Sequence, residues 1–239
     1  MWLYGRHAVL AALANPRRQV SRLLMTETFR ERLGETAGAR RMPEIVDKEF
    51  LDGLLPPEAS HQGVAALVRP LAPLAVEDLL HAAGEQPAAC LVVLDEITDP
   101  RNVGAILRSA VAFGAAGAIV TRHNAATETG ALAKAASGAL DRLPIAEAPN
   151  LRRCLDRLKE ASFWCLGLDH PAPRAIGEET PPARTAWVLG AEGRGIRQLT
   201  ARSCDIVVEI PISADVESLN VSNAAAIALH EWARHHRWR

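Results

Sequence analysis

The apolar run Cys90–Leu94 constrains the fold more than any other feature, because it includes no polar side chain. A strand that is apolar on both faces is typical of a parallel sheet covered by helices on both sides. Similar strand-like runs recur further along the chain, at 117–121, 162–168, 186–189 and 205–210. Helical periodicity fills the intervals, at 101–114, 127–137, 150–160, 194–201 and 221–235. The sequence therefore predicts a doubly wound α/β domain over residues 89–239.

The stretch 1–69 contains shorter elements that predict a separate, small α/β module. The expected helices cover 6–14, 29–41 and 48–55, and the expected strands cover 20–25, 44–46 and 64–68. Residues 70–88 are rich in Pro, Ala and Gly. We interpret them as a linker that carries one short helix, 76–83.

Composition excludes several classes of protein. No apolar run approaches the roughly 18–20 residues that a membrane span needs. Arg6 and His7 interrupt the first apolar stretch, which argues against a signal peptide, so the expected location is the cytosol. No Cys-x-x-Cys pair is present, and we therefore expect no metal site. The cysteines are expected to be small apolar core residues: Cys90, Cys154, Cys165 and Cys204.

The formal net charge of −1 argues against a nucleic-acid-binding protein, but the charges are unevenly distributed. Residues 1–41 contain eight arginines and three glutamates, whereas residues 42–58 are mainly acidic. The arginine-rich stretch fits a solvated surface and a phosphate-binding patch equally well.

The first of three motifs, LDEITDPRNVGAILRSAVAFG, covers residues 94–114. A helix is expected to begin after the turn at Asp99-Pro100. Asn102 lies at the entrance of this helix, and Arg108 lies nearly two turns further on. Open α/β sheets bind ligands beyond the carboxyl ends of their strands, so both residues are candidates for a site. The alternative is a capping asparagine and a solvated arginine.

The second motif, WVLGAEGRGI, places Gly190, Gly193 and Gly195 just after a predicted strand. Glycines allow positive φ and close approach of the backbone to a ligand. The motif is not followed by Gly-Lys-Ser/Thr, and its spacing is not G-x-G-x-x-G, which argues against both common nucleotide-binding loops. Taken alone, it indicates a tight turn.

The third motif contains VESLNVSN, whose polar residues immediately precede the apolar run 224–229. Asn220 or Ser222 suffices to cap the expected helix. The remaining polar residues would lie in a turn beyond the preceding strand. Free backbone donors and acceptors in such a turn suit an adenosine and an amino-acid tail.

Taken together and in this order, the three motifs resemble those of the SpoU branch of the SPOUT RNA methyltransferases, which methylate ribose 2′-hydroxyls. The stretches YGRHAV (4–9) and HQGVAALV (61–68) are similar to the substrate-binding extension of the bacterial 23S ribosomal RNA guanosine-2′-O-methyltransferases. The chain departs from the family pattern at Ala214, where a glycine is common, and at Asn223, where an apolar residue is usual.

The resemblance implies a C-terminal SPOUT domain with a deep trefoil knot and a mainly parallel sheet. It implies a small N-terminal α/β RNA-binding domain that is ribosomal protein L30e-like. It also implies a homodimer with the active site near the subunit interface, and S-adenosylmethionine (S-adenosyl-L-methionine) as the cofactor. The implied cofactor pocket is formed by Leu189, Gly190, Gly193, Ile210, Pro211, Ser218 and Leu219.

The same resemblance assigns catalysis to Asn102, Arg108, Glu192, Ser218 and Asn220. It implies Arg108 as the base, although neutralising an arginine at pH 7 costs on the order of 7 kcal/mol. The alternative is that Arg108 holds the adjacent phosphate and stabilises a developing alkoxide, while another group takes the proton.

The implied reaction is methylation of a guanosine ribose in 23S ribosomal RNA. One alternative is the same chemistry on transfer RNA, which the N-terminal module argues against because related tRNA enzymes often lack it. Another is a non-catalytic RNA-binding role in ribosome assembly, which the intact motif residues argue against.

Overall fold

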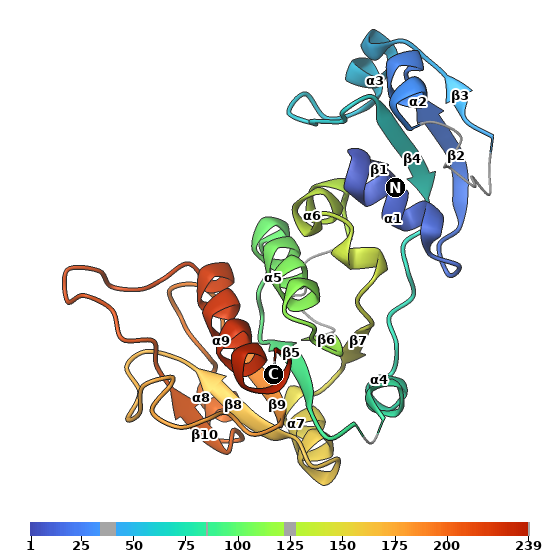
Figure 1. Cartoon of the computed structure of the whole chain (residues 1–239). Helices are drawn as coiled ribbons and strands as arrows, with labels where there is room; N and C mark the ends of the chain where they lie inside the picture. The colour runs from blue at the N-terminus through green and yellow to red at the C-terminus, as the bar shows by residue number, and fades with distance from the viewer. Residues whose placement is uncertain (34–41, 85, 122–127, 239) are drawn as a thin grey trace. The chain divides into compact units, whose positions relative to one another are not determined.

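The computed structural model describes residues 1–33, 42–84, 86–121 and 128–238, which form two compact units (Figure 1). The first unit comprises Met1–Ala72 and Thr127–Arg142, and the second comprises Pro73–Ala126 and Leu143–Arg239. None of the helices in these described ranges is long and apolar enough to cross a membrane. The domain boundaries expected from the sequence, at residues 69 and 88, stay predictions, because this division does not show which segments fold independently.

The first unit is built on a four-stranded sheet in the order β1-β4-β2-β3. Its strands are β1 (Trp2–Tyr4), β2 (Val20–Met25), β3 (Glu44–Ile45) and β4 (Val64–Val68). Strand β4 pairs antiparallel with β1 and β2, whereas β3 pairs parallel with β2. The helices are α1 (Arg6–Ala14), α2 (Glu27–Leu33), α3 (Lys48–Leu54) and α6 (Gly130–Ala136). The expected extension of α2 to residue 41, and the expected start of α6 at residue 127, lie outside the described residues.

Helix α6 and the short 3-10 helix Ala139–Asp141 reach this unit from later in the chain and pack on β1 and α1. Glycines allow these two helices to approach β1 and α1 closely. A Cβ atom on Gly130 would lie 2.6 Å from the carbonyl oxygen of Trp2, and one on Gly138 would lie 2.9 Å from that of His7. The segment 128–142 therefore packs against β1 and α1 so closely that a side chain at either glycine would collide with the backbone.

A buried ion cluster fixes the same segment. The Arg18 side chain is completely buried, and its Nε donates to Asp141 at 2.8 Å. Its Nη1 also pairs with Glu128 and donates to a backbone carbonyl. Asn15 donates to the same Asp141 carboxylate at 3.0 Å. Because an unpaired buried charge is costly, this cluster requires the segment to be in place.

The second unit contains a six-stranded sheet in the order β10-β8-β9-β5-β6-β7, and all its pairs are parallel. This confirms the predicted, mainly parallel sheet. The strands are β5 (Ala89–Leu94), β6 (Gly117–Thr121), β7 (Ile145–Ala148), β8 (Trp164–Leu168), β9 (Arg184–Leu189) and β10 (Ile206–Val208). The helices are α4 (Val76–Ala83), α5 (Pro100–Ala112), α7 (Leu151–Glu160), α8 (Gln198–Ala201) and α9 (Val221–His236).

Three elements depart from the prediction. Strands β1 and β7 are not predicted, because β1 has only three residues and the sequence IAEA of β7 is short and half alanine, which hides the period of a strand. The helix expected over 194–201 begins only at Gln198. Ala191 and Gly195 pair in a β-bridge, so the stretch between them forms a tight turn instead of a helical one.

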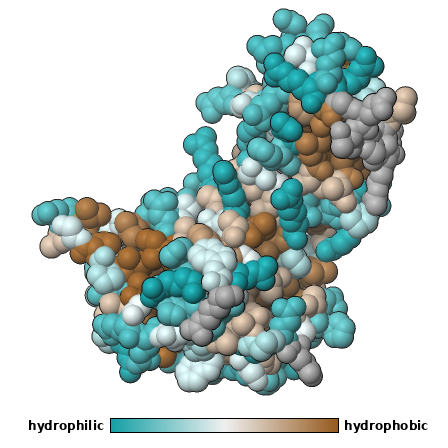
Figure 2. Space-filling view, in the orientation of Figure 1, coloured by the Kyte–Doolittle hydropathy of each residue, from teal (hydrophilic) through white to brown (hydrophobic). Residues whose placement is uncertain are grey.

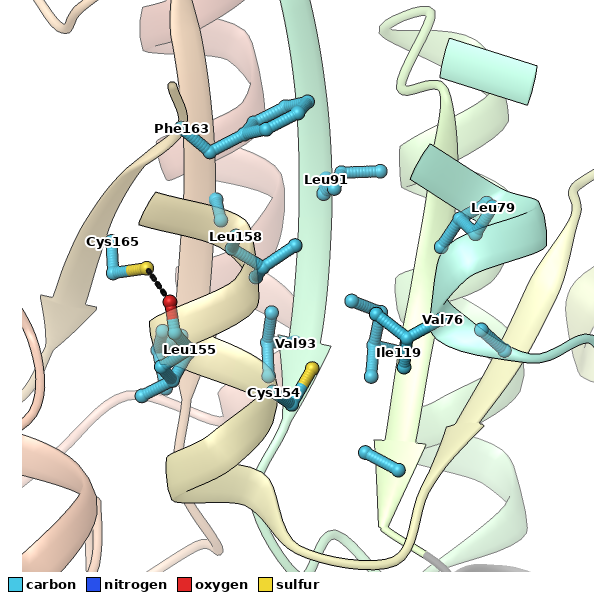
Figure 3. Close-up of a cluster of buried hydrophobic side chains, with 14 of the residues drawn as sticks. Val76, Leu79, Leu91, Val93, Ile119, Cys154, Leu155, Leu158, Phe163 and Cys165 are labelled. Atoms are coloured by element: carbon cyan, nitrogen blue, oxygen red, sulfur yellow. Dashed lines mark hydrogen bonds between the residues drawn. The ribbon is translucent and has the colours of Figure 1, made fainter. Parts of the chain in front are cut away.

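Helices cover both faces of the parallel sheet, as an all-apolar strand requires. Leu91 and Val93 of β5 point into a cluster that includes Leu155 and Leu158 of α7 and residues of α4 (Figure 3). The intervening residues of β5 point to the opposite face and are also buried. Helices α5 and α9 pack against each other, and α9 packs on β9.

Candidate functional site

Three polar side chains from separate motifs meet at one edge of the parallel sheet. Asn102 lies in the first turn of α5, Glu192 in the loop after β9, and Asn220 directly before α9. The Asn102 side chain donates to Glu192 Oε2 at 3.2 Å, and Asn220 Nδ2 donates to Asn102 Oδ1 at 3.0 Å. Asn220 Nδ2 also lies 3.4 Å from Glu192 Oε2. The structure thus brings three of the predicted catalytic residues into one hydrogen-bonded network.

Local sequence explains how two of these side chains are placed. Asp99 caps α5 by accepting from the Arg101 backbone N–H at 2.8 Å, and Pro100 follows at a position that needs no N–H donor. Asn220 caps α9, since its Oδ1 accepts from the Ser222 backbone N–H at 2.9 Å. The other end of the Asn220 amide is left to donate to the network. One residue therefore both starts a helix and orients a polar cluster.

Glycines shape the loop that carries Glu192. A Cβ atom on Gly190 would lie only 2.0 to 2.2 Å from backbone atoms of Gly195 and Ile196, so no other residue fits there. Gly193 and Gly195 have φ of 77° and 65°, which L side chains rarely adopt. The Gly195 N–H donates to the Ala191 carbonyl at 2.8 Å and closes the turn. The motif is a tight turn, as expected, and its backbone borders a cavity.

This cavity has a volume of about 320 Å³ and lies between the carboxyl ends of β8 and β9 and the start of α9. Its size is within the range of small-molecule sites. The predicted cofactor residues that line it are Leu189, Gly190, Gly193, Ile210, Ser218 and Leu219, together with the predicted catalytic Glu192. Pro211, which the resemblance assigned to the pocket, is not among the residues that line it. Hydrophobic atoms gather beside the start of α9, where the preceding loop meets the helix (Figure 2).

Several lining residues are missed by the sequence analysis. Asp169 and His170 directly follow β8, and Glu217 lies one residue before Ser218. The signal for Asp169 is available in the sequence, because it is the first residue beyond a predicted parallel strand. The cavity is lined by three carboxylates and one arginine, namely Asp169, Glu192, Glu217 and Arg194. This balance of charge suits a ligand with net positive charge.

Arg108 is placed differently from the other predicted catalytic residues. It is exposed on α5, six residues and about 9 Å of helix beyond Asn102. It does not line the cavity, and it makes no hydrogen bond or ion pair with the residues that the structure describes. Arg108 is therefore not a hydrogen-bonded member of the network that the described residues form. Asn223 is also exposed on α9, and Ala214 lies in the loop before Ser218.

The remaining candidates for ligation or nucleophilic chemistry are the histidine, cysteine and acidic side chains. Within them, His, Cys, Asp and Glu side chains form no group of three or more that could hold a metal ion. The cysteines are free thiols, three of them buried and Cys204 partly buried. Burial raises the pKa of Cys154 and of Cys204 to about 12, so both remain protonated at neutral pH. This agrees with the predicted role of the cysteines as core residues.

The parallel α/β fold and the three converging motifs define a protein with a ligand site beyond the carboxyl ends of its strands, and comparison with known proteins gives the family. Residues 89–230 match the SpoU rRNA Methylase family, and residues 2–74 match a family described as RNA 2′-O ribose methyltransferase substrate binding. The first match covers more than half of the chain. The protein therefore belongs to the SpoU rRNA methylase family.

Individual relatives agree with this assignment. The chain is 38% identical to an uncharacterized tRNA/rRNA methyltransferase of Synechocystis, over 96% of this chain and 61% of that protein, so it spans about six tenths of that relative. It is 35% identical to the 23S rRNA (guanosine-2′-O-)-methyltransferase RlmB of Pseudomonas putida, over 97% of this chain and 95% of the relative. The crystal structure of the SpoU methyltransferase AviRb from Streptomyces viridochromogenes shares the fold, with a TM-score of 0.81, 24% identity, and coverage of 98% and 89%.

Proposed function

We propose that this protein is an S-adenosylmethionine-dependent methyltransferase that acts on a ribose 2′-hydroxyl of RNA, and that its target is a guanosine of 23S ribosomal RNA. The observation that carries the proposal is the network of Asn102, Glu192 and Asn220 beside the glycine-bordered cavity. The named relatives support the choice of ribosomal RNA, since RlmB proteins of several bacteria are 35–45% identical to this chain.

The residues of the cavity fit the proposed cofactor. Gly190 lets the turn pack closely against the backbone of Gly195 and Ile196, and Gly190 itself lines the cavity, where its backbone groups could contact a nucleoside. Leu189, Ile210 and Leu219 offer apolar contact to an adenine ring. The surplus of carboxylates suits the positive charges of a sulfonium and an ammonium group. Gly193 and Ser218 complete the lining, and we keep Pro211 as a proposed neighbour of the pocket.

When bound, S-adenosylmethionine supplies a methyl group that is already activated by positively charged sulfur. The protein must then orient the attacking hydroxyl and accept its proton. Asn102 and Asn220 both point their amide donors at Glu192 Oε2, which fixes the orientation of that carboxylate. We assign positioning of the hydroxyl to this network and to Ser218. We assign to Arg108 the binding of the adjacent phosphate and stabilisation of the developing alkoxide, while another group or water takes the proton of the hydroxyl and the donor leaves as its neutral thioether.

The remaining features that the resemblance implies belong to the same proposal. The C-terminal part would form a deep trefoil knot, and the N-terminal part would be a ribosomal protein L30e-like RNA-binding domain. The proposal includes a cytoplasmic location and catalysis without a metal. Exposed N-terminal arginines such as Arg6 and Arg17 would contact RNA phosphates, which is consistent with the family match of residues 2–74, whereas Arg18 is buried in its ion cluster.

A homodimer is the proposed active form, and the outer face of α9 supports it. Asn223, Ile227, His230 and Arg234 follow one another along this face and are all exposed. Ile227 is 40% exposed, and Trp238 beyond the helix is 55% exposed. The Phe113, His230 and Trp238 rings lie 5.6 to 5.9 Å apart. Exposed aliphatic and aromatic side chains among polar ones are typical of a protein interface. We propose that a second copy binds there and brings further groups to Arg108.

The decisive experiment combines donor binding with mapping of the product. The purified protein is titrated calorimetrically with S-adenosylmethionine and then incubated with unmodified 23S ribosomal RNA or with transfer RNA. Nucleosides are identified by mass spectrometry, and sites are mapped with and without the gene. We expect 2′-O-methylguanosine in 23S ribosomal RNA only. Label on transfer RNA alone would favour the tRNA alternative, and donor binding without any methylated ribose would favour a non-catalytic role.

A further inference from the structure

Arg197, at the end of the glycine loop, pairs with two carboxylates that directly follow β5, those of Asp95 and Glu96. Its Nε and Nη2 atoms donate to Asp95 Oδ1 at 2.7 and 2.6 Å, and its backbone N–H donates to Asp95 Oδ2 at 3.2 Å. Its Nη1 pairs with Glu96 at 2.9 Å. Asp95 is 1% exposed and directly follows β5, and its N–H donates to the Leu189 carbonyl at the end of β9.

The ion pair between Arg197 and Asp95 lies where two segments that carry site residues begin or end. The turn that begins at Asp95 leads to the cap of α5 and then to Asn102. The loop that ends at Arg197 carries Glu192. Glu96 has φ of 58°, in the left-handed region that costs energy for a residue with a side chain. Because Glu96 keeps this unfavourable φ while it is paired with Arg197, we infer that the ion pair helps to maintain the conformation of the turn.

We propose that Arg197 is a positioning residue for methyl transfer, which ties the loop 190–196 to Asp95 and so keeps Glu192 within hydrogen-bonding distance of Asn102. This inference rests on the proposed function. Arg197 does not touch the cavity, and it acts through the loop.

The charges around Arg197 argue against a direct role in binding RNA. Although its side chain is 48% exposed, Nε, Nη1 and Nη2 are each already engaged by a carboxylate. The hydrogen bond with Asp95 also raises the pKa of Arg197, so the residue stays charged. Arg197, Asp95 and Glu96 together carry a net charge of −1, which repels a phosphate.

The test compares Arg197→Gln with Arg197→Lys and with a matched control, Arg174→Gln. Arg174 is exposed to 50% and pairs with Glu179, away from the loop. With saturating donor and varied RNA, we expect Arg197→Gln to lower kcat about tenfold or more while the KM for RNA changes less than about twofold. Arg197→Lys, which keeps the charge but contacts fewer carboxylate oxygens, should give an intermediate kcat. The control should match the wild type.

Hydrogen–deuterium exchange provides a readout that does not depend on activity. Amides of residues 190–196 should exchange faster in Arg197→Gln and at the wild-type rate in Arg174→Gln. An unchanged kcat with only a lower melting temperature would overturn the proposal, as would an unchanged kcat with a raised KM for RNA. If the wild type transfers no methyl group, the proposed function fails, while the exchange rates still show whether Arg197 holds the loop.

Discussion

At the scale of single residues, Asn220 combines two roles that reside at opposite ends of its amide. Its oxygen caps α9, and its nitrogen donates to Asn102. Aspartate caps helices as well as asparagine does but cannot donate. We therefore expect Asn220→Asp to change the free energy of unfolding by less than about 1 kcal/mol and to lower kcat at least tenfold. Urea unfolding and methyl transfer measure the two effects, and equal activity of the variant and the wild type would contradict the assigned role.

Gly190 provides a second prediction, based on contact distance. Alanine at this position would place its Cβ against the backbone of Gly195 and Ile196, which cannot move without opening the loop. We expect Gly190→Ala to weaken binding of S-adenosylhomocysteine at least tenfold, as measured by calorimetry. The control is Gly53→Ala in α3, where a Cβ meets nothing within 4 Å. That change should leave binding intact and stabilise the helix by up to about 1 kcal/mol.

The buried cysteines lead to a prediction about alkaline pH. Burial raises the pKa of Cys154 to about 12 from an ordinary value of 9.0. Above pH 9 the unfolded thiol loses its proton while the folded thiol retains it, so stability falls as the pH rises from about 9 towards 12. Each such thiol contributes a slope of about 1.4 kcal/mol per pH unit. Urea unfolding between pH 8 and 10.5 should show a shallower slope for Cys154→Ala, and an identical slope would contradict the shift.

At the scale of elements, the attachment of segment 128–142 to the first unit depends on the buried Arg18 cluster. Replacing Arg18 with Met leaves the carboxylates of Asp141 and Glu128 without their charged partner, and we expect a loss of about 3–5 kcal/mol in the free energy of unfolding. Arg22→Met is the control, because Arg22 and Glu44 are 42% and 49% exposed and their ion pair is worth less than about 1 kcal/mol. If urea unfolding gave similar losses of unfolding free energy for Arg18→Met and Arg22→Met, the buried cluster would not be what holds the segment 128–142 in place.

The positions of several elements could be predicted from local sequence signals, whereas the contacts between distant elements could not. The apolar run of β5, the caps Asp99 and Asn220 and the breaker glycines carry local signals, and the corresponding elements lie where they are predicted. The hydrogen bonds between Asn102, Glu192 and Asn220 join residues that are 28 to 118 positions apart. No local pattern gives such distances, and only the family resemblance brought these residues together in advance.

The first unit illustrates a different limit of sequence analysis. The stretches YGRHAV and HQG suggest substrate binding by resemblance, yet several of their atoms contact α6. Lys134 donates to the Ser60 carbonyl at 2.8 Å and to Gln62 at 3.1 Å, and Gly5 lies against the Lys134 side chain. Composition alone cannot show that a segment more than 70 residues away completes this unit, because the signal is complementary shape and not periodicity.

At the scale of the whole molecule, the proposed dimer connects the exposed face of α9 to catalysis. Ile227 lies at the middle of this face, and a charge there would be buried without a partner in a dimer interface. We expect the wild type to sediment as a dimer and Ile227→Glu to sediment as a monomer that has lost most of its methyl transfer. Donor binding by each chain should persist, since the cavity is formed within one chain.

The control for this prediction is Leu199→Glu on α8, which changes an apolar residue that is 70% exposed and lies outside the α9 face. It should remain a dimer with full activity. Two results distinguish a dimer formed through the α9 face from a dimer formed through another surface. A monomeric and inactive Ile227→Glu that still binds the donor shows that Arg108 or another group needs the partner subunit. An Ile227→Glu protein that remains a dimer shows that the second copy binds elsewhere, and it removes the outer face of α9 as the interface.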